Sequence, residues 1–299
     1  MRDLSHYTFT EWLAAAPLAH RLRRARNRLV DRVYGQRPAA GQEALVERLR
    51  GAPVLAFTVA FNMPDAVALL ADAMGRFLPG TPLVVCDNST DDAARTDIAR
   101  LCAGRDLPYC PLPPSPYRGK RNGSRSHAVA LNWIVANLVR PAAPGVIALI
   151  DHDLIPLGPE DFVQRVAGQP CYGLVRHGTG NEAWYLWPGY SVFDFGRVAG
   201  TPLDFGTDTP LTLDTGGQNW DVLYRTLDLP RLRMASRRRV YLADVETGES
   251  EHFMLTDNWL HVGGAGHRGG GAGALARVRR AYDADPDGLL ASLLASGPP

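Results

Sequence analysis

Two aspartates separated by one residue lie directly after the most hydrophobic stretch of the chain. Asp151-His152-Asp153 follows the apolar run Val146–Ile150. Alternate residues of an extended segment face the same side, so Asp151 and Asp153 can share one target. Two carboxylates that lie close enough to share a target repel each other unless a cation lies between them. Mg²⁺ and Mn²⁺ prefer carboxylate and phosphate oxygens, so the motif predicts a divalent metal site that stabilises a departing nucleoside diphosphate.

The elements around this motif alternate in a way that places it at the edge of a sheet. The short, apolar runs that we expect to be strands are 54–59, 82–86, 107–112 and 146–150. The expected helices are 66–77 (with Asp65 as its cap), 91–102 and 126–138. Strand, loop and helix alternation predicts a parallel sheet in an α/β fold, with ligands bound outside the carboxyl ends of the strands.

The second half of the chain has weaker strand signals and a glycine-rich tract. Further strands are expected over 171–176, 183–187, 191–194 and 254–262. A strand end is expected at 211–214 and a helix over 219–226. We divide the chain into a helical N-terminal extension (1–50), a main domain (51–265), and a flexible glycine-rich loop with a helical C-terminal tail (266–299).

Composition excludes several classes of protein. The chain has 299 residues, of which 45% are hydrophobic and 21% charged, so global disorder is not expected. A net charge of +1 gives no argument for nucleic-acid binding. The four cysteines form no C-x-x-C pair, which removes support for a zinc ribbon or a thioredoxin-type site. Neither a signal peptide nor an apolar run of about 20 residues is found, so we expect a cytoplasmic enzyme.

Five arginines gather in the N-terminal segment, where leucines recur at helical intervals. They are Arg21, Arg23, Arg24, Arg26 and Arg28. One interpretation is a helix that makes weak contact with an anionic membrane surface. The other is a solvated helix that packs on the main domain through its leucines, which the nearby acidic Asp31, Glu43 and Glu47 favour.

A second acidic motif follows the apolar run 83–86. Asp87-Asn88-Ser89-Thr90 has the residue types of an Asx turn that caps a helix. Because Asp87 ends a predicted parallel strand at the ligand-facing edge, its carboxylate could also accept the imide hydrogen of uracil. The motif therefore has a structural role and a candidate role in binding a base.

Together these motifs resemble the family-2-like glycosyltransferases of the GT-A fold. The matching features are Phe61-Asn62 after the first strand, Asp87–Asp91 after the second, Ser126–Asn132 at a helix start, and Asp151–Asp153 after the next strand. The resemblance covers 53–160 well and is loose over 170–265. It does not extend to 1–50 or to the tail.

The resemblance implies a GT-A fold, which is a Rossmann-like, mostly parallel nucleotide-binding sheet with helices on both faces. The residues that it assigns to the nucleotide-sugar donor are Ala60, Phe61, Asn62, Asp87, Asn132 and Asp151. Arg118, Lys120 and Arg121 precede the helix at 126 and would meet the diphosphate of the donor. As an alternative, these three cations belong to a solvated surface loop.

His261 is the third candidate metal ligand, beside Asp151 and Asp153. It follows the apolar stretch 253–260 and precedes the glycine-rich tract. Many GT-A enzymes complete the metal site with a late histidine before a flexible loop, and the glycines here would allow a loop to close over the donor. His267 is an alternative ligand or a phosphate contact.

The general base of the reaction is expected to be an aspartate, since an inverting transferase needs a carboxylate to take the proton of the acceptor hydroxyl. The resemblance places this group at the start of a helix, where Asp214 lies. Asp214 departs from the usual Glu-Asp pair because Leu213 precedes it, and it could instead be a helix N-cap. The alternative bases are Asp204, Asp208 and Asp221.

An aromatic stretch lies between the metal motif and the candidate base. Sugar rings present apolar C–H faces that stack on aromatic side chains. We expect one or two of Trp184, Trp187 and Tyr190 to reach the acceptor, and the others to be core.

The sequence thus favours a metal-dependent glycosyltransferase that uses Mn²⁺ or Mg²⁺. It would move a sugar from a nucleotide-sugar donor, with UDP favoured, to a hydroxyl acceptor, with inversion. The acceptor would be a glycan, a lipid-linked sugar or a small molecule. A nucleotidyltransferase is the first alternative, but the turn after the first strand, residues 60–64, lacks glycine and cations. The second alternative is a non-catalytic nucleotide-binding module on a GT-A scaffold.

Overall fold

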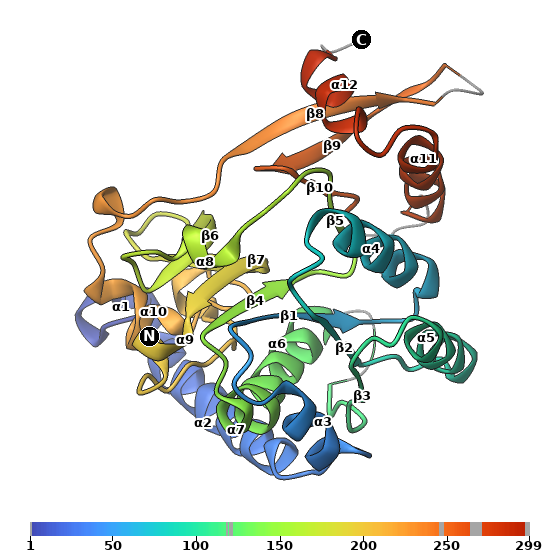
Figure 1. Ribbon diagram of the computed structural model, residues 1–299. Helices are drawn as coiled ribbons and strands as arrows, with labels where there is room; N and C mark the ends of the chain where they lie inside the picture. The colour runs from blue at the N-terminus through green and yellow to red at the C-terminus, as the bar shows by residue number, and fades with distance from the viewer. Residues whose placement is uncertain (1, 118, 120–121, 245–247, 264–270, 297–299) are drawn as a thin grey trace.

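A computed structural model describes residues 2–117, 119, 122–244, 248–263 and 271–296 (Figure 1). Its strands form two sheets, a six-stranded sheet in the order β3-β2-β1-β4-β7-β6 and a four-stranded sheet in the order β5-β10-β9-β8. In the first sheet the four adjacent strands β3, β2, β1 and β4 are parallel to one another. Strand β7 runs antiparallel to its two neighbours, β4 and β6. The second sheet is antiparallel throughout.

The first half of the chain follows the predicted alternation closely. Its strands are β1 (Val54–Ala60), β2 (Leu83–Asp87), β3 (Tyr109–Pro111) and β4 (Val146–Ile150). Its helices are α4 (Pro64–Phe77), α5 (Asp92–Gly104), α6 (Gly123–Ile134) and α7 (Arg140–Ala142), with a π-helical segment, Val135–Val139, between the last two. The expectation that Asp65 caps α4 is wrong, because Met63 is the N-cap and Pro64 begins the helix.

The second half departs further from the prediction. Its strands are β5 (Leu154–Pro156), β6 (Cys171–His177), β7 (Trp184–Asp194), β8 (Arg237–Ala243), β9 (Ser250–Thr256) and β10 (Trp259–His261). Short helices lie among them, namely α8 (Phe162–Arg165), α9 (Phe195–Val198), α10 (Asn219–Val222) and the 3₁₀ turns Thr209–Leu211, Tyr224–Thr226 and Leu229–Arg231. The chain ends with α11 (Gly271–Ala284) and α12 (Leu289–Ala295).

Three sequence expectations in this half need correction. The two strands expected at 183–187 and 191–194 are one strand, β7. The single strand expected over 254–262 is a hairpin of β9 and β10, which turns at Asp257 with a φ of +48°. The strand end expected at 211–214 is only an isolated bridge between Asp208 and Leu213.

The N-terminal segment is helical, as the sequence predicts. It consists of a 3₁₀ turn (Leu4–His6), α1 (Phe9–Leu13), α2 (Ala16–Gly35) and α3 (Gln42–Leu49). Tyr34 is buried and donates a hydrogen bond from its hydroxyl to the carbonyl of Pro113, while α3 contributes Leu49 to the core. None of the described helices has the length and apolar character that crossing a membrane requires.

Helices cover both faces of the six-stranded sheet (Figure 1). The clearest case is β1, a strand buried along its whole length. Ala56 belongs to a core cluster with α4 and α5, and its neighbours Leu55 and Phe57 belong to a cluster with α3 and α6. A strand with two buried faces needs a continuous apolar run rather than an alternating one, and 54–60 supplies it. The predicted α/β class, a mostly parallel sheet with helices on both faces, is confirmed.

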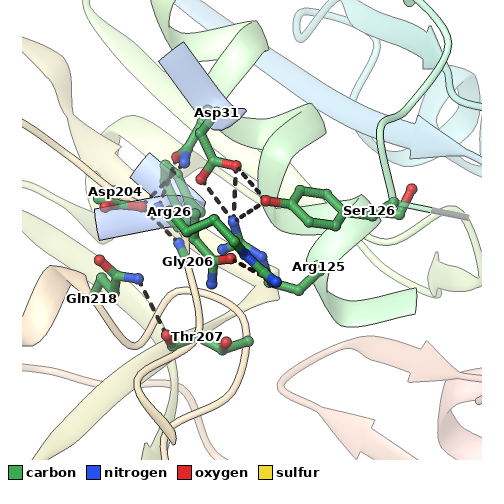
Figure 2. A network of polar contacts seen from close by, with 12 residues as sticks. Arg26, Asp31, Arg125, Ser126, Asp204, Gly206, Thr207 and Gln218 are labelled. Atoms are coloured by element: carbon green, nitrogen blue, oxygen red, sulfur yellow. Dashed lines mark hydrogen bonds and ion pairs between the residues drawn. The ribbon is translucent and has the colours of Figure 1, made fainter. Parts of the chain in front are cut away.

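A largely buried ion pair fastens α2 to the start of α6. A terminal nitrogen of Arg125 donates to both carboxylate oxygens of Asp31, at 2.8 and 2.9 Å, and the two side chains are each 13% exposed (Figure 2). The same guanidinium donates to the hydroxyl of Tyr117 and lies over its ring. Burial raises the pKa of Asp31 even though Arg125 acts in the opposite direction. Desolvation therefore offsets much of the attraction within this pair.

We predict that Asp31→Ala lowers the free energy of unfolding by about 3–5 kcal/mol, because it leaves a buried guanidinium without its carboxylate. Urea denaturation measures the change. The exposed pair Asp97–Arg100 is the matched control, and Asp97→Ala should cost no more than about 0.5 kcal/mol. Replacing both partners, as Asp31→Leu with Arg125→Met, should recover most of the loss. If the double variant is no more stable than Asp31→Ala, the desolvation argument fails.

Candidate metal centre

The metal motif lies where β4 leaves the six-stranded sheet. The backbone N–H of Asp151 donates to the carbonyl of Gly189 on β7, and the N–H of Leu154 donates back to the carbonyl of Asp151, both at 3.0 Å. The chain therefore turns within Asp151-His152-Asp153 and continues as β5 in the second sheet. Asp151 is half-buried and Asp153 is buried. Two carboxylates at the carboxyl edge of a parallel sheet are what the sequence predicts.

His261 reaches this turn through the pairing of β5 with β10. In that antiparallel ladder His261 lies opposite Leu154, the residue after Asp153. The N–H of Val262 donates to the carbonyl of Asp153 at 3.0 Å, which extends the contact by one residue. The imidazole Nε2 of His261 then lies 3.6 Å from a carboxylate oxygen of Asp153. Pairing across more than 100 positions of sequence thus brings the three predicted ligands together.

The three side chains form a group that could hold a metal ion. Each offers one ligand atom, and the atoms of Asp151, Asp153 and His261 all lie within 4.8 Å of one another. Two carboxylates and an imidazole suit Mn²⁺, Mg²⁺ and similar divalent ions, and a site with three protein ligands leaves coordination positions for substrate oxygens. The donor set therefore fits the ion that the sequence predicts.

Opposing influences act on the pKa of His261. Burial lowers it, whereas the adjacent carboxylate of Asp153 and the charge of Asp151 raise it, and the net pKa lies above the ordinary value. The two aspartates therefore favour a positive charge at the position of the histidine. A divalent cation bound by the two carboxylates also supplies positive charge, and it competes with the proton for His261, since an imidazole must be neutral to bind a metal.

Two further histidines surround the motif, and the sequence did not assign them. His127, in the second turn of α6, has its Nε2 at 3.7 Å from a carboxylate oxygen of Asp151, and burial lowers its pKa. Nδ1 of His152 lies 3.1 Å from the carbonyl of Val59 at the end of β1, and its other ring nitrogen is buried. His152 thus ties β4 to β1. His127 is a neutral neighbour of the candidate metal ligands.

Trp187 is the aromatic residue that the structure places at this centre. Its ring packs against that of His261, with centroids 4.7 Å apart. It folds back over Gly189, where an added Cβ would come within 2.1 Å of the indole. An irregularity allows this position: β6 pairs Gly173 with Ser191 but Val175 with Leu186, so β7 carries extra residues at this point.

The other two aromatic candidates for the acceptor belong to the core, in line with the expectation that only one or two of the three reach the acceptor. Trp184 is buried and packs on Tyr224 with ring centroids 4.8 Å apart. Tyr190 is fully buried and its hydroxyl donates to Glu160 at 3.1 Å. Neither side chain is accessible to an acceptor. The sugar-stacking prediction now rests on Trp187 alone.

The loops after β1 and β2 are joined to each other. Ala60 lies beside Asp87 in the parallel ladder. The side-chain oxygen of Asn62 accepts from the N–H groups of Thr90 and Asp91, at 2.9 and 3.0 Å, and its amide nitrogen donates to Thr90. The side chain of Asn62 is thus committed to holding the second loop. Phe61, the first residue of the loop after β1, is half-buried and stays a candidate for the donor.

Asp87 is fully buried at the end of β2, where it makes two hydrogen bonds. One carboxylate oxygen accepts from the N–H of Ser89 at 2.8 Å, as in an Asx turn, and the other accepts from the hydroxyl of Tyr109 at 2.9 Å. The cap of α5 is Asp91, whose side chain accepts from Ala94. The structural role of Asp87 is confirmed, and its contact with a base stays a prediction.

Asn132 supports a loop in the second half of the chain. Its amide nitrogen donates to Asp204 at 3.1 Å, and its oxygen accepts from the N–H of Phe205 at 2.8 Å. Figure 2 shows the Asp204 segment, in which Gln218 also donates to the carbonyl of Thr207. Both ends of the Asn132 amide are therefore used within the protein. Asn132 thus positions this loop, and its assignment to the donor stays a prediction.

Asp214 is exposed and lies on the side of the candidate metal centre. It is close enough for its charge to act on His127 and on Tyr185. It is not the cap of α10, because that helix begins at Asn219 with Gln218 as its N-cap. The alternative interpretation as a helix cap is therefore wrong.

The three alternative bases have structural partners. Asp208 is buried, and Arg24 of α2 pairs with it at 3.7 Å and with Asp221 at 2.8 Å. A carboxylate oxygen of Asp204 accepts from Asn132 and from the N–H of Gly206. These contacts hold α2 and the loop together. Asp214 remains the candidate base.

Arg176 is a cation that the sequence did not single out. It lies opposite Tyr185 in the ladder of β6 and β7, and its charge acts on His261. Burial lowers its pKa, and the charge of Arg237 lowers it further. No carboxylate of the described residues lies within ion-pair distance of Arg176. The sequence gave no sign of a functional role for Arg176, because a lone arginine in an apolar strand is usually a solvent-exposed residue at the edge of a sheet.

Four predicted contacts lie outside the described residues. They are Arg118, Lys120 and Arg121 of the basic loop and His267 of the glycine-rich tract. Their assignments stay predictions.

The chain matches no protein-family model and no curated protein. Among solved structures it is similar to a mannosyltransferase from Pyrobaculum calidifontis in complex with GDP-Man and Mn²⁺, with 17% sequence identity and a TM-score of 0.38 over 67% of this chain and 59% of that one. It is also similar to glucosyl-3-phosphoglycerate synthase from Mycobacterium tuberculosis.

Two complexes of that synthase match, one with phosphoglyceric acid and one with Mn²⁺ and UDP-glucose. Both have 18% identity and a TM-score of 0.28 over 46% of this chain, and 49% and 48% of theirs. The chain thus spans between about half and three fifths of the length of the solved structures it matches. At these TM-scores the likeness assigns neither a family nor an activity.

We predict that His261→Ala weakens Mn²⁺ binding by at least about 10–100-fold, the loss that removing even an outer partner of a metal ligand causes. Isothermal titration with MnCl₂ measures the affinity. His252 of β9 is exposed and outside the group, so His252→Ala is the matched control and should bind as the wild type does. Equal affinities for all three proteins would show that His261 is not a ligand of the bound ion, and an undetectable affinity in the wild type would show that the group holds no Mn²⁺.

Proposed function

We propose that this protein is a metal-dependent glycosyltransferase of the GT-A type, which moves a sugar from a nucleotide-sugar donor to a hydroxyl acceptor. The observation that carries the proposal is the group Asp151, Asp153 and His261 at the carboxyl edge of the parallel strands. Nucleotides bind at this edge in open α/β sheets, and their diphosphates need a counter-charge there. The group offers ligands for the ion that supplies it.

The donor is proposed to lie across the ends of β1, β2 and β4. Ala60 and Phe61 would line the base pocket beside Asp87, and Asp151 would hold the ribose side of the nucleotide. Each Asp87 oxygen already accepts one hydrogen bond, from Ser89 or from Tyr109, and a carboxylate oxygen can accept a second. An imide hydrogen of uracil is such a donor, which would reach the buried Asp87 by entering between the loops after β1 and β2, so UDP is the proposed nucleotide.

The leaving group of the reaction is the nucleoside diphosphate, whose negative charge grows as the bond to the sugar breaks. A divalent ion held by Asp151, Asp153 and His261 would act as a Lewis acid on that charge. His127 stays neutral at neutral pH because burial lowers its pKa, so it leaves the charge of Asp151 available to the ion. His152 fixes the motif against β1 through Val59.

Asp214 is the proposed base, which takes the proton from the acceptor hydroxyl as that oxygen attacks the sugar. Its carboxylate is exposed, and among the described residues it accepts a hydrogen bond through one oxygen, from the N–H of Thr215. The other oxygen can therefore accept the proton. An attack from the side opposite the diphosphate would invert the configuration at the sugar, which is the stereochemistry we propose.

The acceptor is proposed to meet Trp187. This side chain is half-buried beside His261, so one apolar surface lies next to the candidate metal ligands. Aromatic rings bind the C–H face of a sugar. Trp187 and Asp214 together would place a sugar hydroxyl near the reacting carbon.

A panel of nucleotides tests the function directly. We predict that UDP with Mn²⁺ raises the melting temperature more than GDP, dTDP or CDP with Mn²⁺, because a ligand that binds only the folded state stabilises it in proportion to RT ln(1 + [L]/Kd). EDTA should abolish the shift. A shift that is the same for all four nucleotides, or that EDTA leaves unchanged, would contradict the proposed donor site. Mn²⁺-dependent hydrolysis of the nucleotide sugar then separates an enzyme from a non-catalytic binding module.

Asp214→Asn tests the mechanism. We predict that turnover falls by roughly 10²–10⁴-fold, the usual contribution of a general base, while the affinity for UDP and Mn²⁺ stays near that of the wild type. Asn keeps an oxygen that can accept from Thr215, so the loop should be unchanged. The control is Asp228→Asn, which alters an exposed aspartate paired with Arg231. Turnover of Asp214→Asn within a few-fold of the control would rule out Asp214 as the base.

A further inference from the structure

The N-terminal helices expose most of the large apolar side chains found on the surface. Among the described residues nine such side chains are exposed, and seven of them lie between Phe9 and Val33. The other two are Val163 and Leu294. Soluble proteins rarely leave apolar side chains gathered in this way, and a gathered set marks an interaction surface.

The exposed side chains of α2 form one stripe. We define the apolar stripe as Leu18, Leu22, Leu29 and Val33, which are between 50% and 62% exposed. At about 100° per residue, its four members lie within an arc of about 60° of the helix. In α1, Phe9, Trp12 and Leu13 are exposed at i, i+3 and i+4, which is again one face, and α1 packs on α2. The apolar stripe is therefore a continuous feature of the helix and not scattered exposure.

The opposite face of α2 is fixed to the protein, so it is the stripe that points outward. Arg24 pairs with Asp208 and Asp221, and Asp31 pairs with Arg125. Tyr34 is buried against Pro113. On the same scale of 100° per residue these inner residues lie roughly 120–180° from the stripe. Packing on the main domain, the second interpretation of the sequence, thus uses the polar face of the helix and leaves the leucines free.

Cations border the stripe on both sides. Arg21, Arg28 and Arg32 fall within about 40–80° of Leu18 on one side, and Arg26 falls about 80° away on the other. Helix α2 has six arginines and one aspartate, and with Arg24 and Asp31 engaged inward, five arginines and no acid remain. None of these five forms an ion pair with a described residue. The outer face therefore combines an apolar centre with unneutralised positive borders.

We propose that the outer face of α1 and α2 docks on an anionic lipid surface, with the apolar stripe in the acyl boundary and the arginines at the phosphate headgroups. A helix that lies in this interface has leucine and aromatic residues on one face and arginines at its borders. Long arginine side chains reach back from the apolar layer to the headgroups. Charge complementarity favours an anionic surface over a neutral one.

Docking would also bring one side of the candidate active site to that surface. The loop that carries Asp214 is held by the inner face of α2 through Asp208 and Asp221. A helix is about 10–12 Å in diameter, so this loop would lie about one helix from the lipid. An acceptor presented at the surface would approach from the side of the proposed base. The docking proposal itself does not depend on the transferase proposal.

Vesicle binding tests the proposal on the full chain. The probes are vesicles of phosphatidylglycerol mixed with phosphatidylcholine, and vesicles of phosphatidylcholine alone, in a co-sedimentation assay. The wild type should bind the anionic vesicles and lose binding as salt rises, because salt screens the arginines. Arg21→Gln with Arg28→Gln and Arg32→Gln should weaken that binding by about 100-fold, at roughly fivefold for each of the three charges removed.

The stripe is tested by Leu18→Gln with Leu22→Gln and Leu29→Gln, which should abolish binding to the anionic vesicles. Glutamine is a good helix former, so α2 should persist, and circular dichroism checks this. The matched control is Val163→Gln with Leu294→Gln, which removes exposed apolar side chains elsewhere and should bind as the wild type does.

Three results would overturn the proposal. The first is a wild type that does not bind anionic vesicles, which needs no variant. The second is equal binding to the two kinds of vesicle. The third is a wild type that is dimeric by light scattering and does not bind vesicles, together with a stripe variant that is monomeric. In that case a second copy of the chain covers this face.

Discussion

The antiparallel pairing of β5 with β10 is the constraint on which the candidate site depends. Because β5 begins directly after Asp153, the register of this ladder decides which side chain of β10 meets the metal motif, and it selects His261. A slip of one residue would turn that histidine to the other face of the sheet. The buried Trp259 and Leu260 stabilise the register, since any slip would expose them or leave a cavity in the core they share with α4.

The rest of the site is positioned from the opposite side by β7 and α2. The irregularity of β7 places Trp187 over Gly189, and the carbonyl of that glycine accepts from Asp151. Asn132 holds the loop that carries Asp214 through its hydrogen bond with Asp204. Arg24 of α2 holds the same loop through Asp208, which precedes Asp214, and Asp221, which follows it. The metal ligands are therefore rigidly built, whereas the candidate base is exposed at the tip of a loop that two buried contacts anchor.

How much the sequence predicted depends on whether a signal is local. The strands 54–60 and 146–150 are continuous apolar runs, so their burial and the position of Asp151 at a strand end follow from local pattern. Trp184, Trp187 and Tyr190 could not be told apart, because an irregular ladder alters which residues share a face. The strand β8 was missed, since its first residues, Arg237 to Arg239, are exposed and give no alternation. Asn62 and Asn132 matched a pattern of motifs, but their hydrogen-bond partners lie on distant loops.

A crystal structure of the protein with UDP and Mn²⁺ tests the central claim most directly, through anomalous diffraction from manganese. We expect an anomalous peak bonded to Asp153 and His261 and adjacent to Asp151, with the diphosphate between that peak and the loops after β1 and β2. A manganese peak elsewhere, or UDP bound at the strand ends with no metal on Asp153 and His261, would contradict it.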